Sequence, residues 1–127
     1  MAVRSTLAAQ LIWRCGLDAP RESCGLLASN GTGRITSIYA MRNVHEDPID
    51  YFRMDDSELL ETWGDIERRG YNVVAYYHSH VTTPAEPSEF DLQRQVPGLV
   101  SVIVSLVGDG DVRAWDGKIP YGGNLFD

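Results

Sequence analysis

The sequence of 127 residues is poor in cysteine, in positive charge and in long apolar runs. Its two cysteines, Cys15 and Cys24, belong to no C-x-x-C motif, which argues against a redox role. One disulfide is arithmetically possible, but burial as small apolar side chains is the expected role. The 11 Lys and Arg against 18 Asp and Glu give a formal net charge of −7. This excess of acid argues against nucleic acid as a partner, because nucleic-acid binding needs clustered Lys and Arg.

No apolar stretch approaches the roughly 20 residues that a membrane-spanning helix needs. The N-terminal run LAAQLIW, residues 7–13, is short and is not followed by a small-residue cleavage site, so it also differs from a signal peptide. No internal repeat or low-complexity linker divides the chain. We therefore expect one cytoplasmic domain spanning residues 1–127, with no membrane partner. The oligomeric state stays open.

The pattern of apolar residues predicts a mixed order of helices and strands. A helix is expected from an N-cap at Ser5 to a stop at Gly16, and a second helix begins at a capping box formed by Asp55 and Glu58. A short helix follows an N-cap at Ser88. Strands are expected at residues 24–29, 34–41, 51–54, 72–77, 99–107 and 112–115. The expected fold class is α/β (α+β), a single mixed, partly curved sheet flanked by helices.

The stretch HSHVTTPAEPSEFD, residues 78–91, carries the candidate chemistry. Side chains two apart in a strand point the same way, so His78 and His80 can reach one ion. Asp91, in the first turn of the short helix, can supply a third ligand. Three protein ligands plus water is the count of a catalytic zinc site. The alternative is a surface His-x-His pair beside a helix that Ser88 and Asp91 merely cap, and spacing alone leaves it open.

A metal-dependent hydrolase also needs a general base near its water. Glu86 and Glu89 lie in the same stretch, but a solvated role suits these two residues better. Glu22 stands two residues before Cys24, the first residue of the apolar segment CGLLAS, so a charged residue is held at the edge of the expected core. It is either a candidate base or a solvated residue at the entry of a strand, and spacing does not decide between them.

The whole set of residues resembles the JAMM, or MPN-plus (Mov34), metallopeptidase family. The family pattern is an upstream glutamate, then His-x-His, seven residues, Ser, two residues and Asp. It matches Glu22, His78, His80, Ser88 and Asp91. The surrounding P-x-E-x-C-G-L-L at residues 20–27 also matches, and the resemblance covers about residues 7–115.

The resemblance implies one Zn²⁺ per chain, held by His78, His80 and Asp91. It implies that Glu22 is the general acid/base and that Ser88 donates a hydrogen bond to the developing oxyanion. It implies hydrolysis of an amide bond after the C-terminal Gly-Gly of a ubiquitin-like protein. The architecture it implies is related to that of cytidine deaminases, but their H-x-E and P-C-x-x-C motifs are absent from this sequence.

Most residues after Asp91 belong to expected strands, so we expect none of the insertions with which eukaryotic deubiquitinating members grip ubiquitin. The chain is more similar to compact prokaryotic members, which implies a ubiquitin-like sulfur-carrier protein as substrate and cysteine as a leaving group. Two alternatives remain: a peptidase of other small peptides, of phage-tail or cell-wall type, and a catalytically silent binding scaffold. Ser79, between the histidines, receives no chemical role, and strand alternation predicts that it points away from the metal.

Overall fold

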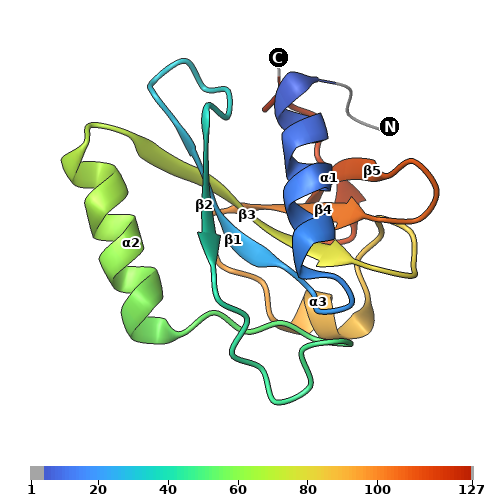
Figure 1. The fold of residues 1–127 in the computed structure, drawn as a ribbon. Coiled ribbons are helices and arrows are strands. Elements are labelled where there is room, and N and C mark those ends of the chain that lie inside the picture. Colours follow the sequence, from blue (N-terminus) through green and yellow to red (C-terminus); the bar gives the residue numbers. More distant parts are fainter. Residues whose placement is uncertain (1–4, 127) are drawn as a thin grey trace.

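A computed structural model describes residues 5–126 (Figure 1), so residues 1–4 and 127 of the expected domain lie outside the described residues. The helices are α1 (Thr6–Asp18), α2 (Asp56–Arg68) and α3 (Glu89–Gln93). The strands are β1 (Cys24–Ser29), β2 (Ser37–Met41), β3 (Asn72–His80), β4 (Val100–Ser105), β5 (Asp111–Asp116) and β6 (Ile119–Pro120). They form one open sheet in the order β2-β1-β3-β4-β5-β6.

The sheet is mixed because β3 and β4 run parallel, while the other neighbouring strands described run antiparallel. Parallel strands need a crossover connection, and this one carries α3. The expected α/β (α+β) class with helices flanking one mixed sheet is confirmed. The crossover leaves β3 at His80, so residues 78–91 lie at the carboxyl end of the parallel pair, where open α/β sheets commonly bind ligands.

Each face of the sheet has its own apolar core. Leu11 and Cys15 of α1 pack in one core, and Ile66 of α2 packs in the other. Strand side chains alternate between the faces. From Ala75 to the end of β3, the odd-numbered residues point toward α1. The even-numbered residues from Tyr76 onward point toward the α2 face. Both histidines of residues 78–91 therefore share the α2 face.

The cysteines are free and buried, and they lie in different cores, Cys15 with α1 and Cys24 with α2. Burial raises the pKa of each thiol to about 12. A thiol with such a pKa carries almost no thiolate at neutral pH and is chemically inert. Both side chains pack as small apolar groups, as expected.

Two expected helix signals are wrong in detail. Gly16 does not end α1, which continues to Asp18. A glycine within a helix costs only about 1 kcal/mol, so it is a weak stop. At α2 the Asp55 side chain accepts from the N–H of Glu58, but the Glu58 carboxylate binds Arg42 instead of completing a capping box. No helix among residues 5–126 is both long and apolar enough to cross a membrane.

Candidate metal centre

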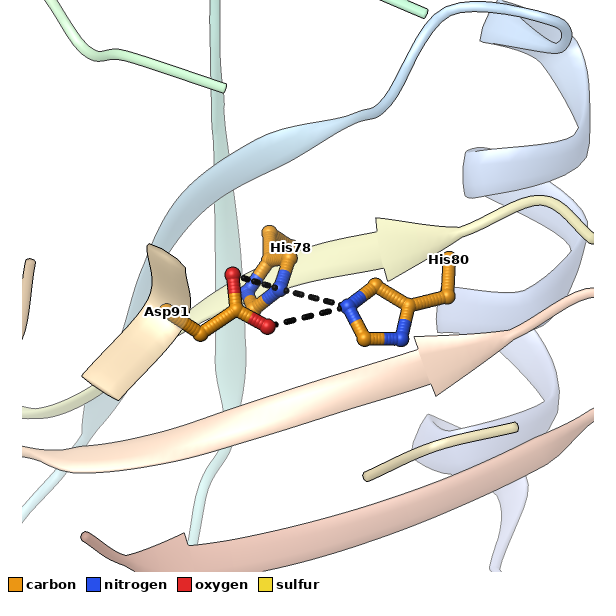
Figure 2. A group of neighbouring side chains, drawn as sticks. All are labelled: His78, His80 and Asp91. Carbon is orange, nitrogen blue, oxygen red and sulfur yellow. Dashed lines mark hydrogen bonds and ion pairs between the residues drawn. The ribbon is translucent and has the colours of Figure 1, made fainter. Parts of the chain in front are cut away.

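The two histidines and the aspartate converge at the carboxyl end of β3 (Figure 2). His78 Nε2 lies 3.1 Å from His80 Nε2 and 3.2 Å from Asp91 Oδ1. His80 Nε2 lies 3.1 Å from Asp91 Oδ2. All three residues are at most 9% exposed, so two imidazoles and a carboxylate face one another inside the protein.

The three side chains fit a tetrahedral metal site. Zinc binds histidine nitrogen and carboxylate oxygen at about 2.0–2.2 Å, so ligand atoms of a tetrahedron are separated by about 3.3–3.6 Å. The separations of 3.1–3.2 Å lie within a few tenths of an ångström of that range. A buried set of two imidazole nitrogens and one carboxylate is also a donor set that zinc prefers.

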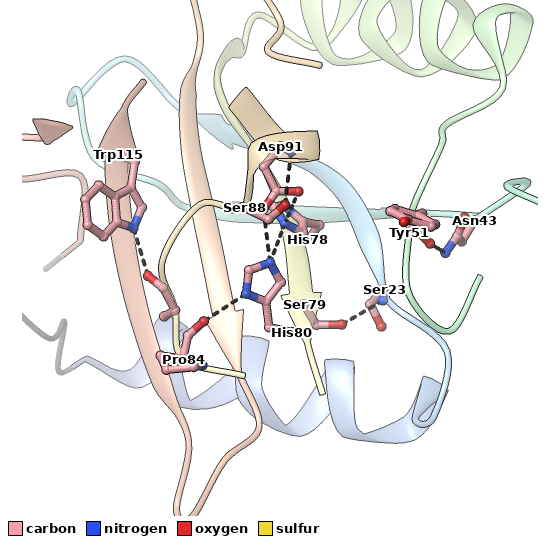
Figure 3. A network of polar contacts seen from close by, with 11 residues as sticks. Ser23, Asn43, Tyr51, His78, Ser79, His80, Pro84, Ser88, Asp91 and Trp115 are labelled. Carbon is pink, nitrogen blue, oxygen red and sulfur yellow. Dashed lines mark hydrogen bonds and ion pairs between the residues drawn. The ribbon is translucent and has the colours of Figure 1, made fainter. Parts of the chain in front are cut away.

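His80 is oriented by a hydrogen bond. Its Nδ1 lies 2.8 Å from the carbonyl oxygen of Pro84, which can only accept, so Nδ1 carries a hydrogen and Nε2 is the ring nitrogen left to bind a metal ion. The loop with this carbonyl is tied to the sheet (Figure 3). Trp115 Nε1 donates to the Ala85 carbonyl at 2.9 Å, and Ser105 Oγ donates to another loop carbonyl at 2.7 Å. The loop and the sheet thus fix the tautomer of this imidazole.

His78 is oriented by packing instead. Its ring stacks on Phe52 with centroids 4.4 Å apart and an interplanar angle of 17°, and its buried Nδ1 has no hydrogen-bond partner among the described residues. Phe52 belongs to residues 51–54, where the sequence predicts a strand, and that prediction is wrong. The segment is a loop, because the Arg53 N–H bonds the Asn43 side chain rather than a neighbouring strand.

The protonation of the three side chains follows from their contacts. Burial alone would raise the pKa of Asp91, but hydrogen bonds from His78 and His80 outweigh burial and hold that pKa well below its ordinary value. Burial lowers the pKa of His78. Burial also acts to lower the pKa of His80, but Asp91 and the Pro84 carbonyl outweigh it and raise that pKa. A cation entering the site would meet the ionised carboxylate of Asp91 and would compete with protons for the two imidazoles.

Ser88 and Asp91 form the capping box that begins α3. Ser88 Oγ accepts from the Asp91 N–H at 3.1 Å, and Asp91 Oδ2 accepts from the Ser88 N–H at 2.9 Å. The same carboxylate faces the imidazoles, so helix capping and ligation are compatible. The cap uses the Ser88 oxygen as an acceptor and leaves its O–H free to donate.

Glu22 shares a pocket of about 180 Å³ with His80, Ser88 and Asp91. Its side chain is 8% exposed, so it is not a solvated residue at the strand entry. Burial is the main cause that raises the pKa of Glu22 to about 8; the nearby His80 acts against this shift, and Asp91 adds to it. The other two glutamates considered from the sequence, Glu86 and Glu89, are exposed, as expected.

Asn43 holds the main chain of Glu22, and no pattern in the sequence points to this role. A single asparagine between a strand and a loop reads as an ordinary turn residue. Asn43 is only 8% exposed. Its Nδ2 donates to the carbonyls of Glu22 and Pro48 and to that of Tyr51 (Figure 3). Its Oδ1 accepts from the N–H groups of His45 and Arg53.

The chain belongs to the family described as prokaryotic homologs of the JAB domain, which it matches over residues 5–118. The resemblance to JAMM/MPN-type proteins is thereby confirmed at the level of the family. The chain is 33% identical to a desampylase of Haloferax volcanii over 102 residues, which are 79% of this chain and 73% of the relative. It is 32% identical to the CysO-cysteine peptidase of Mycobacterium tuberculosis over 94 residues, 73% of this chain and 64% of that protein. The aligned part thus covers slightly less than two thirds of the mycobacterial relative.

Solved structures have the same fold. A protein from Desulfitobacterium hafniense has a TM-score of 0.71 at 27% identity, over 83% of this chain and 75% of that one. A JAB1/MPN domain protein from Archaeoglobus fulgidus has a TM-score of 0.66 at 17% identity, over 95% of this chain and 94% of that one. At this low identity the second likeness concerns the fold alone.

Proposed function

We propose that the protein is a zinc-dependent metallopeptidase that hydrolyses the amide bond after the C-terminal Gly-Gly of a ubiquitin-like protein. The observation that carries the proposal is the convergence of His78, His80 and Asp91 beside a pocket that Glu22 and Ser88 also line. The names of the relatives, a desampylase and a CysO-cysteine peptidase, support a hydrolase of this kind. A single domain over residues 1–127 and a cytoplasmic location are parts of the same proposal.

In this proposal His78, His80 and Asp91 hold one zinc ion. When bound, zinc polarises a substrate carbonyl and lowers the pKa of water to about 7. The protein holds these side chains ready through the Pro84 carbonyl on His80 and through the stacking of Phe52 on His78. Groups that are fixed before binding lose little conformational freedom when the ion arrives.

Glu22 is the proton carrier of the reaction. It accepts a proton from the attacking water and later donates this proton to the leaving amine. Burial raises its pKa to about 8, which lies near neutral pH. A pKa near the working pH suits a group that must both take and give a proton.

Ser88 is the hydrogen-bond donor to the substrate oxygen that becomes negative in the transition state. Its Oγ is held by the Asp91 N–H, and its O–H is free to donate into the pocket that it lines. Donors fixed in advance at such a position stabilise the developing charge without reorganising.

Cysteine, released from a sulfur-carrier protein, is the first candidate leaving group. The similarity to a CysO-cysteine peptidase supports cysteine as the leaving group. A second pocket of about 470 Å³ adjoins Glu22. Arg21 lines it, together with Asp18 and the ion pair of Arg42 with Glu58. A guanidinium group suits the free carboxylate that a released amino acid carries.

A lysine side chain of a conjugated protein is the second candidate leaving group. The described residues that line the pocket of about 180 Å³ include Glu22, Asp50 and Asp91 but no Lys or Arg. Glu22 and Asp91 are assigned to proton transfer and zinc in this proposal, so Asp50 is the remaining acidic group of the lining. A lysine side chain in an isopeptide bond suits such a lining, because it brings no carboxylate of its own. The relative that is a desampylase is in keeping with this candidate.

Mass spectrometry of two matched substrates tests the proposal. One is a ubiquitin-like carrier ending in Gly-Gly-Cys, and the other is the same carrier joined through Gly-Gly to a lysine of a peptide. We expect cleavage after Gly-Gly of at least one by the zinc-loaded protein, loss of cleavage with a chelator, and its return with zinc. Glu22→Gln should slow cleavage about 10²–10⁴-fold, while Glu89→Gln, at an exposed glutamate, should not slow it.

Each other outcome points to a named alternative. If the protein binds one equivalent of zinc but cleaves neither substrate, the peptidase proposal is wrong and a binding scaffold remains. Equal cleavage of unrelated short peptides would favour the phage-tail or cell-wall type of peptidase. The ratio of the two matched substrates identifies the leaving group.

A further inference from the structure

Ser79 stands between the two histidines but faces the other side of the sheet, as strand alternation predicts. It is fully buried on the α1 side. Ser79 Oγ accepts from the Ser23 N–H at 2.7 Å, and the Ser79 N–H donates to the Ser23 carbonyl at 3.0 Å (Figure 3). Two hydrogen bonds therefore join the residue between the histidines to the residue that follows Glu22.

The register of β1 and β3 explains what these bonds do for Glu22. The strands pair antiparallel with Cys24 opposite His78. Continued by two residues, this register puts Ser23 opposite Ser79 and Glu22 opposite His80. Opposed residues of an antiparallel pair point to the same face, with Cβ atoms about 4.5–5.5 Å apart. The regular strand begins only at Cys24, so beyond it the Ser79 side chain replaces a main-chain acceptor.

Ser23 is itself anchored. Its Oγ donates to Asp18 Oδ2 at 2.6 Å, at the end of α1, and Ser23 is only 4% exposed. A buried N–H that loses its partner costs about 1–3 kcal/mol, so the Ser23 N–H strongly favours the arrangement in which Ser79 accepts from it. The other main-chain bonds of Glu22 go to Pro48 and Asn43, which tie it to the loop after β2 and not to β3.

We propose that Ser79 is a positioning residue, whose paired hydrogen bonds with Ser23 hold the Glu22 carboxyl opposite His80. The expected effect on kcat rests on the proposed peptidase function. The expected effect on the position of the Glu22 carboxyl rests on the geometry alone. The Ser79 side chain faces the side of the sheet opposite to His78 and His80. It acts through Glu22.

Substitutions of Ser79 distinguish a role in positioning Glu22 from a general role in the stability of the fold. In Ser79→Ala we expect kcat to fall about 10–100-fold, because a misplacement of about 1 Å costs that much, while KM and zinc affinity change less than about twofold. Ser79→Thr keeps the oxygen and should restore most of the activity. Ser29→Ala is the matched control: Ser29 is also buried, and its Oγ also accepts main-chain N–H groups, but at the other end of β1. It should leave kcat unchanged.

A double substitution shows through which residue Ser79 acts. Added to Glu22→Gln, Ser79→Ala should lower the residual activity less than about twofold, because the group it positions is already lost. Effects that multiply, or a loss of zinc affinity in Ser79→Ala, would overturn the proposal. If Ser79→Ala does not fold, Ser79→Cys, of similar size but a weaker acceptor, should give the same pattern at smaller amplitude.

Crystal structures of the metal-free variants test the inference even if no substrate is cleaved. We expect the Glu22 carboxyl to move away from His80 in Ser79→Ala and to keep its place in Ser29→Ala. An unmoved Glu22 in Ser79→Ala would refute the positioning role, whatever the activity. Failure of the wild-type protein to cleave would refute the proposed function and leave this structural test intact.

Discussion

The two halves of the candidate site are built in different ways. The ligand half, His78, His80 and Asp91, comes from 14 consecutive residues that end one strand and begin one helical turn. The carboxylate half is Glu22, whose position depends on Asn43 and Ser79, residues distant from it in the sequence. A local pattern therefore defines the first half, and only the complete fold defines the second.

The two halves also differ in charge. The imidazoles hold the pKa of the Asp91 carboxyl well below its ordinary value, whereas burial raises the pKa of Glu22 to about 8. The two carboxyl groups line one pocket, but their pKa values are shifted in opposite directions. Such a separation is typical of sites where one carboxylate stays ionised and the other carries a proton. It assigns ligation to Asp91 and proton transfer to Glu22 in our proposal.

Loss of a ligand should have the largest effect. His80→Ala removes one of three ligating atoms, and we expect zinc binding at stoichiometric concentration to disappear and turnover to fall to the level of the chelated protein. Metal analysis of the purified variant and a cleavage assay measure the two effects. The control is His45→Ala in the loop after β2, which should bind one zinc. A His80→Ala protein that still binds zinc would show that His80 is not a ligand, and the division of the site into two halves would be wrong.

Glu22→Gln should come next. Loss of a general acid/base costs about 10²–10⁴-fold in turnover, and the variant should retain one zinc because Glu22 is not a ligand in the proposal. Parallel measurements of kcat and zinc content check this. Full activity would remove Glu22 from the mechanism, and loss of zinc would move it into the ligand half.

Ser88→Ala should lower kcat about 10²–10³-fold, the cost of removing one oxyanion donor. The variant also loses the N-cap of α3, so the free energy of unfolding should fall by about 1 kcal/mol. Steady-state kinetics and urea unfolding measure the two losses. A stability loss with unchanged kcat would reduce Ser88 to a helix cap.

The pH dependence of stability tests the raised pKa of Glu22 in the metal-free protein. The folded pKa of about 8 lies above the ordinary 4.5, so the contribution of this group is fully present below about pH 4.5 and is lost as the pH rises through 8. Glu22→Gln does not titrate. It should therefore gain stability over the wild type as the pH rises, by about 1–3 kcal/mol at pH 9. Urea unfolding with a chelator at pH 5, 7 and 9 measures the difference, and a difference that does not grow with pH contradicts the shift.

Trp115→Phe should have the smallest effect. It removes the donor to the Ala85 carbonyl and loosens the loop whose Pro84 carbonyl orients His80. Outer-shell losses cost about 10–100-fold in metal affinity, and we expect the lower end because Ser105 still holds the loop. Competition with a fluorescent zinc chelator gives the affinity. At saturating zinc, kcat should be unchanged.

The convergence of His78, His80 and Asp91 could be predicted from the sequence, because strand alternation and a helical first turn are local rules. Strand alternation puts His78 and His80 on one face of β3. Ser88 is a recognisable N-cap residue, and it places Asp91 in the first turn of α3. The mixed sheet with flanking helices was predictable from the same kind of periodicity.

The sequence was insufficient where side chains take the place of main-chain partners. Residues 51–54 have strand-forming composition, but the Asn43 side chain binds the Arg53 N–H and the segment becomes a loop. The stacking of Phe52 on His78 and the depth of Glu22 both depend on that loop, through contacts between distant parts of the chain. No spacing rule describes them.

A crystal structure of the zinc-loaded protein, with the metal located by anomalous scattering, tests the central claim most directly. The account predicts one zinc per chain bound to His78 Nε2, His80 Nε2 and the Asp91 carboxylate, with Glu22 one water molecule away. A zinc ion bound by other residues, no ion at all under saturating zinc, or a Glu22 carboxyl turned out of the pocket would contradict it.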